Sequence, residues 1–91
     1  MANSRTIDPT KRPRGHAKLK KGIAGRIAKI RGKRSQRGFA RDLGVFQQNV
    51  NRYESGTTPH VDFLITLALR ENVSLDWLLC GRGRPHRNQT A

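Results

Sequence analysis

Apolar side chains recur at helical spacings along most of this chain. The first run begins at about Ala17, where spacings of four, four and three residues place four apolar side chains on one face: Leu19, Ile23, Ile27 and Ile30. The residues before it are polar and basic and include Pro9 and Pro13. We therefore predict a flexible basic arm over residues 1–16 and a first helix that follows it.

Two short helices joined by a tight turn are predicted next. Ser35 can cap the first of them, because its hydroxyl can accept a bond from an exposed backbone N–H group. Gly44 tolerates the positive φ at which that helix must stop. The second helix covers about residues 47–54. The apolar side chains that both helices turn inward are Phe39, Ala40, Leu43, Val50 and Tyr53.

Two further helices complete the predicted domain. One covers about residues 63–71, with Asp62 as its N-cap, and the other covers residues 75–80, between a Ser74 cap and Gly81. Residues 82–91 are polar and basic and are predicted to form a disordered tail. The pattern as a whole predicts an all-α fold, a compact bundle of about five short helices over residues 17–81.

The composition limits the functions that such a domain can have. A chain of 91 residues with 34% hydrophobic residues can form one small domain with little room for a substrate pocket. No arrangement typical of a catalytic site stands out, so we expect no enzyme activity, small-molecule substrate or cofactor. The three histidines and Cys80 lack metal-ligand spacing, so no metal site is expected.

The cellular setting is predicted from what the chain lacks. The lone cysteine allows no internal disulfide, which suits a reducing compartment such as the bacterial cytoplasm or nucleoid. The chain has no apolar run of about 18 residues, so no membrane segment is expected.

The positive charge is concentrated outside the predicted turn and its two helices. The formal net charge is +13, of which residues 1–34 carry +11, residues 35–81 carry −1 and residues 82–91 carry +3. Such an excess favours an anionic partner. The arm could follow a phosphate backbone or enter a minor groove, or could add only solubility and weak attraction. The tail sequence from Arg82 to Pro85 resembles the core of an AT-hook, and plain disorder is the alternative.

The second helix of the predicted pair is crowded with amide side chains. Two helices joined by a short turn form the unit that places a helix in the DNA major groove. The amides of Gln47, Gln48, Asn49 and Asn51 could read bases there, since an amide can pair bidentately with adenine. Arg52 could reach a guanine or a phosphate. The alternative is that this polar surface is only a solvated helix face.

The segments that flank these amides resemble one known family. Residues 23–81 are similar to the helix-turn-helix domains of phage repressors and Cro, with a lambda-repressor-like fold. The residues that carry the resemblance are Gln36 at the start of the second helix, the small Ala40, Gly44 at the turn, the segment Tyr53-Glu54-Ser55-Gly56, and the closing segment from Val73 to Gly81.

The resemblance implies roles for residues around the turn. In this family the glutamine that opens the second helix contacts a phosphate, as do residues after the third helix, which here are Gln36 and the pair Thr57 and Thr58. The family also pairs an arginine of the first helix with the glutamate that ends the third, here Arg31 and Glu54. The chain departs from the family between Arg31 and Gln36, where the link is about two residues shorter and Arg34 stands near the position of an apolar residue.

Pattern, charge and resemblance together predict a sequence-specific DNA-binding transcriptional regulator. We expect a repressor, phage-like or bacterial, that binds double-stranded DNA as a homodimer on a palindromic site. The predicted DNA-binding residues are Gln36, Arg37, Phe46, Gln47, Gln48, Asn49, Asn51, Arg52, Thr57 and Thr58. The alternatives are a non-specific basic protein that binds RNA or DNA and an antitoxin-like regulator with a protein partner.

Overall fold

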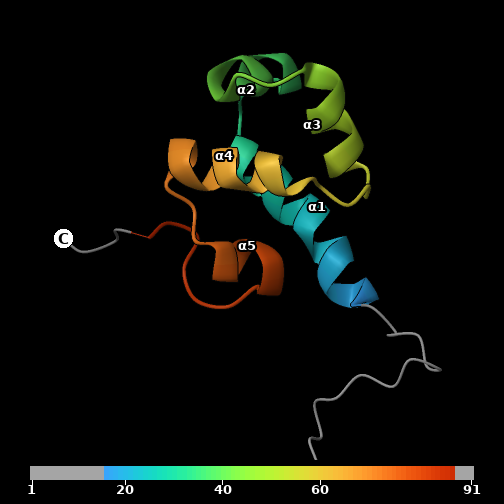
Figure 1. Ribbon diagram of the computed structural model, residues 1–91, viewed down its shortest axis with the longest axis vertical. Helices are drawn as coiled ribbons and strands as arrows, with labels where there is room; N and C mark the ends of the chain where they lie inside the picture. Colours follow the sequence, from blue (N-terminus) through green and yellow to red (C-terminus); the bar gives the residue numbers. More distant parts are fainter. Residues whose placement is uncertain (1–15, 88–91) are drawn as a thin grey trace, which may run out of the picture.

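Five α-helices make up the described part of the chain. The computed structural model describes residues 16–87, with α1 (Ala17–Arg31), α2 (Gln36–Leu43), α3 (Gln47–Glu54), α4 (Val61–Glu71) and α5 (Leu75–Cys80). Figure 1 shows α2 and α3 together at one end of the molecule and α5 at the other, with α4 between them. The predicted all-α fold and its five helices are confirmed. Of the predicted arm, only His16 lies within the described residues.

One hydrophobic core holds the helices together. Its side chains with no exposed surface come from all five helices and from the residue after the α4 turn: Ile27, Phe39, Val50, Leu67, Val73 and Leu78. The rings of Tyr53 and Phe63 meet edge-on with centroids 4.7 Å apart, which joins α3 to α4. Leu19 differs from the predicted α1 stripe, because it lies one turn before the buried part of the helix and is exposed.

The predicted helix ends at Ser35, Gly44 and Ser74 are confirmed. The hydroxyl oxygens of Ser35 and Ser74 accept backbone N–H bonds of 2.9 and 3.2 Å at the starts of α2 and α5. Gly44 ends α2 with a left-handed φ of 74°. Because these ends depend on residues near in sequence, their local chemistry is enough to fix them.

The predicted N-cap at Asp62 is wrong. Helix α4 begins at Val61, and His60 occupies the cap position without a side-chain bond. Val61 is exposed, so it adds nothing to the inward-facing pattern that marked the start of the predicted helix. The Asp62 carboxylate lies instead in the first turn, where its negative charge interacts favourably with the helix dipole.

The short link between α1 and α2 is closed by the side chain of Arg34. Its guanidinium donates two bonds to the Glu71 carboxylate, of 2.9 and 3.2 Å, and one of 3.2 Å to Asp42. The guanidinium carbon also lies 4.7 Å from the centroid of the Phe39 ring. A cation over an aromatic ring therefore covers the core at this link.

Arg34 also ends α1. It donates bonds of 2.8 and 3.1 Å to the carbonyl oxygens of Ile30 and Arg31, which lack helical partners at this terminus. The hydrogen bond to Glu71 is the main cause that raises the pKa of Arg34 above its ordinary value. The charged form is thus the one that fits this position.

The start of the predicted disordered tail is ordered against the domain. The N–H of Ser74 donates to the carbonyl of Pro85 at 2.7 Å, and the N–H of Arg87 donates to the carbonyl of Asn72 at 3.0 Å. An antiparallel bridge between Val73 and its partner at position 86 lies between these bonds. Residues 82–87 therefore extend the folded unit past Gly81, and residues 88–91 lie outside the described part of the chain.

Candidate nucleic-acid interface

The turn between α2 and α3 fixes how α3 is presented. The backbone N–H of Val45 donates to the carbonyl of Ala40 at 3.0 Å, directly after Gly44. Ala40 is 3% exposed, and such a small side chain permits close approach of the two helices. Val50 and Tyr53 anchor the inner face of α3 in the core. The opposite face of α3 is thereby held outward by packing on both sides of the turn.

The outer face of α3 carries most of the predicted reading side chains. Gln47, Gln48, Asn51 and Arg52 are all exposed. Asn49 differs from them: it is half-buried and lines an open groove of about 340 Å³ between α3 and α4, together with Tyr53, Asp62 and others. Four of the five predicted reading side chains on this helix are therefore exposed to a partner.

A hydrogen-bond network joins α1, α2 and α3 behind this face. Arg31 donates bonds of 2.8 and 3.1 Å to the Glu54 carboxylate, the ion pair that the resemblance implies. Gln36 donates a bond of 3.0 Å to the same carboxylate and accepts one of 3.2 Å from the Asn51 amide. The pKa of Arg31 is raised, chiefly by the hydrogen bond to Glu54. The network holds the Gln36 and Asn51 side chains beside each other at the edge of the outer face of α3.

The remaining predicted residues surround the outer face of α3. Arg37 is exposed in the first turn of α2, and Phe46, at the N-cap of α3, is 79% exposed. Thr57 and Thr58 are exposed in the loop after α3, and the N–H of Thr57 donates to the carbonyl of Arg52 at 3.0 Å. Of the predicted residues, Gln36 and Asn49 are half-buried and the others are exposed, and the side-chain contact among them is the bond between Asn51 and Gln36.

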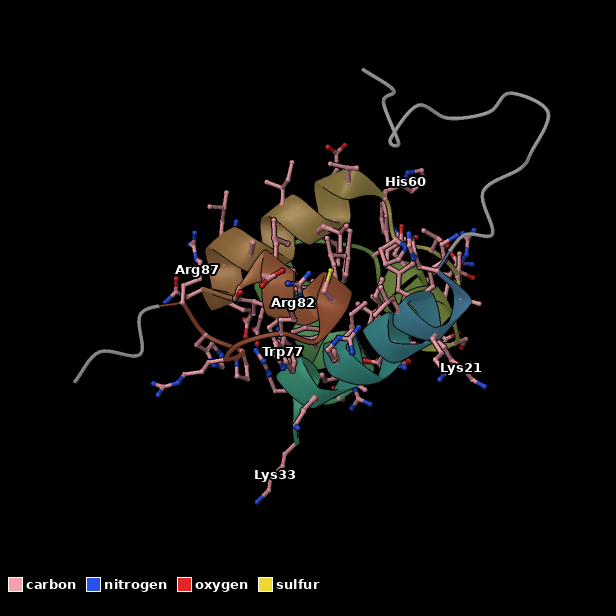
Figure 2. The ribbon with its side chains drawn as sticks, turned by 90° about the horizontal axis from the view of Figure 1, so that it is seen from below. Lys21, Lys33, His60, Trp77, Arg82 and Arg87 are labelled. Carbon is pink, nitrogen blue, oxygen red and sulfur yellow. The ribbon has the colours of Figure 1, made fainter. Side chains whose placement is uncertain are left out.

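Positive charge is exposed on α1 and on the link that follows it. The lysines of α1 and of the link after it are exposed: Lys18, Lys20, Lys21, Lys29 and Lys33. Figure 2 shows Lys21 and Lys33 pointing away from the body of the domain. Carboxylates of the described region are partly neutralised, since Asp42, Glu54 and Glu71 accept from arginines. The electrostatic balance of the described surface favours an anion.

Other kinds of site find little support in residues 16–87. Within that range no three His, Cys, Asp or Glu side chains gather as a metal site would require. None of the helices described there has the length and apolar character of a membrane span.

Fold and site together define a helix-turn-helix domain. The family of bacteriophage CI repressor helix-turn-helix domains matches residues 22–86, from the middle of α1 to the segment paired with Val73. The chain therefore belongs to this family, a regulatory class of DNA-binding domains and not a class of enzymes. The predicted resemblance to phage repressors is confirmed. Comparison with curated proteins and with solved structures gave no significant match.

Two features of the site escaped the sequence reasoning. Spacing gave no sign that Gln36 and Asn51 share a hydrogen bond, because they lie 15 residues apart on different helices. The position of Asn49 beside a groove was also missed, because the amides of this helix were taken together and not by their angle around it. A helical projection centred on Val50 and Tyr53 would have placed Asn49 nearer the core than Gln48.

Proposed function

We propose that this chain is a sequence-specific transcriptional repressor that reads the DNA major groove with the outer face of α3. The observation that carries the proposal is the exposed set of amides on a helix whose other face is anchored by Val50 and Tyr53. The major groove admits one helix, and only there does every base pair present a distinct pattern. A helix that is fixed to the domain on one side can enter this groove, and the amides on its other side can bond to the base edges.

Base reading falls to the N-cap and the outer face of α3. The exposed amides of Gln47 and Gln48 can each pair with adenine N6 and N7, and Arg52 can reach a guanine or a phosphate. Phe46 cannot donate or accept a hydrogen bond from its side chain, so the major-groove group that suits it is the thymine methyl. Asn49 lies outside this set of base-reading residues because its side chain lines the groove between α3 and α4 of the protein.

Phosphate contacts fall to the edges of the same surface. Gln36 and Arg37 stand in the first turn of α2, where free backbone N–H groups also favour an anion. Thr57 and Thr58 stand in the loop beyond α3. Such contacts set the position of the helix on the duplex without reading its sequence. The bond from Asn51 to Gln36 joins an amide that would face the DNA major groove to a residue that would contact a phosphate.

The repressor binds as a homodimer on a palindromic site in this proposal. Two α3 helices related by a twofold axis would enter major grooves about 34 Å apart, one helical turn of DNA. Family resemblance supports the dimer, and the symmetry of a selected binding site would report it directly.

Selection from random duplexes with the full chain tests the proposal. Gln47→Ala and Gln48→Ala should each lower affinity for the selected duplex by about 10- to 100-fold, because each good bidentate contact is worth about 1–3 kcal/mol. Affinity for a scrambled duplex should stay the same. Equal affinity of the glutamine variants for the selected duplex would refute direct reading by α3.

A non-specific basic protein is the second candidate, and the exposed lysines of α1 favour it. Removal of residues 1–15 separates the two. If that removal abolishes binding while Gln47 and Gln48 are dispensable, charge alone accounts for the affinity. If the selected sequence preference survives and only the salt slope falls, by about 0.9 for each phosphate that the shortened chain leaves unneutralised, the repressor proposal holds.

A further inference from the structure

The outer face of α4 carries a stripe of apolar side chains that no residue within 16–87 covers. Val61, Ile65 and Leu69 follow one another at intervals of four residues, and they are 67%, 47% and 68% exposed. The other large apolar side chains exposed among residues 16–87 lie singly on other elements. Residues four apart lie on one side of a helix, so these three form one continuous strip, which we call the α4 stripe.

We propose that the α4 stripe is the surface through which two copies of this chain pair. The pairing deepens the proposed function, because it names the surface of the dimer that would bind a palindromic site. Two copies with a net charge of +13 repel each other over most of their surface. Within Val61–Glu71 the charged residues are Asp62, Arg70 and Glu71, so this helix offers a contact without a positive excess.

The stripe is complementary to itself when two α4 helices run antiparallel. Ile65 is its midpoint, so Ile65 of one copy would meet Ile65 of the other, while Val61 would meet Leu69. The same arrangement brings Asp62 of one copy towards Arg70 of the other, and it sets the two helix dipoles in opposite directions. Each contact then occurs twice, as a twofold interface requires.

The arrangement also keeps both reading helices on one side of the pair. In Figure 1, α2 and α3 lie on one side of α4, and Figure 2 shows several side chains of α4 pointing outward, away from α1. A twofold axis that lies in the interface, perpendicular to α4, places the second copy's α2 and α3 on the same side of the pair as those of the first. The three side chains of the stripe are few beside the roughly 20–30 residues per partner of a standard interface, so the free dimer is weak.

Salt dependence gives the first test. Salt screens the repulsion between copies, so sedimentation equilibrium at about 1 mM chain should show more dimer at about 0.5 M than at about 0.05 M salt. DNA affinity changes in the opposite direction. Ile65→Asp should abolish the dimer and weaken binding to a full palindrome, while binding to a half-site and the helical circular dichroism stay unchanged. A dimer that survives Ile65→Asp, or no dimer at any salt, would overturn the pairing.

Cysteine cross-linking tests the register. In a Cys80→Ala background, Ile65→Cys should form a disulfide with its own copy under mild oxidation. Leu69→Cys and Val61→Cys lie four residues from the axis, so each is about 12 Å from its counterpart, beyond the roughly 7 Å that a disulfide spans. These two should cross-link only when mixed with each other. Random collision would favour the more exposed positions 61 and 69 over position 65, and that result would overturn the proposal.

The two proposals can fail separately. If no α4 variant affects self-association but Gln47 and Gln48 still determine the selected sequence, the pairing fails and the repressor proposal stands. If no duplex is selected at all but Ile65→Cys still forms the disulfide, the repressor proposal fails and the pairing through α4 stands.

Discussion

Removal of the Glu54 carboxylate tests whether one side chain sets the orientation of the reading helix. Its side chain is 8% exposed and accepts bonds of 2.8 and 3.1 Å from Arg31 and of 3.0 Å from Gln36. Loss of one partner of a buried ion pair costs about 3–5 kcal/mol. The Arg31 side chain is 25% exposed and keeps its bond to the carbonyl of Arg34, so part of that cost is relieved by water. We therefore expect Glu54→Ala to lower the free energy of unfolding by about 2–3 kcal/mol.

A loss of this size is large for so small a domain. A folded unit of about this length has a total stability of roughly 4–10 kcal/mol, so the midpoint of thermal unfolding should fall by about 8–20 °C. Urea unfolding followed by helical circular dichroism measures the free energy. Asp62→Ala removes the same charge from an exposed site and should cost only about 0.3–1 kcal/mol, from the first turn of α4.

The reasoning is refuted if Glu54→Ala costs no more than Asp62→Ala. A double-mutant cycle with Arg31→Ala sharpens the test, since contacting partners should couple by about 0.5–3 kcal/mol. Strictly additive effects would show that the Arg31–Glu54 contact, although 2.8 Å long, does not fix α3 to α1.

Four smaller changes should follow from contacts described above. Gly44→Ala should cost about 1–2 kcal/mol in urea unfolding, because φ is 74° and the added Cβ meets nothing within 4 Å, so that only backbone strain remains. Ser74→Ala should cost about 1 kcal/mol because it removes the α5 cap, and a change under about 0.3 kcal/mol would contradict this. Arg34→Ala and Glu71→Ala should couple in a double-mutant cycle by about 1 kcal/mol, since they share two hydrogen bonds, and independence would contradict the closure of the link. The pKa values of Arg31 and Arg34 are raised above the ordinary value of arginine. The two side chains therefore stabilise the folded state fully at any pH below the ordinary arginine pKa, and this contribution is lost only as the pH rises through the higher pKa of the folded state. Arg34→Ala should therefore cost the same at about pH 7 and about pH 9, and a cost that falls between them would refute this sign.

Short-range chemistry is the part of this fold that the sequence predicts well. Ser35, Gly44 and Ser74 act within three or four residues of their own positions, so their effect can be recognised without the rest of the chain. The buried faces of α2 and α3 follow from helical spacing for the same reason. The predicted start of α4 is wrong because its first residue, Val61, is apolar yet faces solvent.

Long-range hydrogen bonds are the part that the sequence does not predict. Arg34 and Glu71 lie 37 residues apart, and no local pattern marks them as partners. Residues 82–87 have the composition of a disordered segment, but their order depends on backbone groups of Asn72 and Ser74 that become available only where α4 ends and α5 begins. In the candidate site, the exposed amides follow from spacing, whereas the bond between Gln36 and Asn51 requires both helices to be in place.

The guanidinium that closes the link between α1 and α2 leaves a signature that related sequences should share. Arg34 fits at this link because Glu71 and Asp42 accept bonds from its guanidinium and Phe39 lies beneath it. Loss of either Arg34 or Glu71 alone would strand a partly buried charge, so relatives should change the two positions together. Relatives with the short link should therefore carry a basic residue before α2 and an acidic one at the end of α4, whereas relatives with a longer link and an apolar residue should carry neither. Joint variation at positions 34 and 71 could thus sort the members of the family by how they seal this corner of the core.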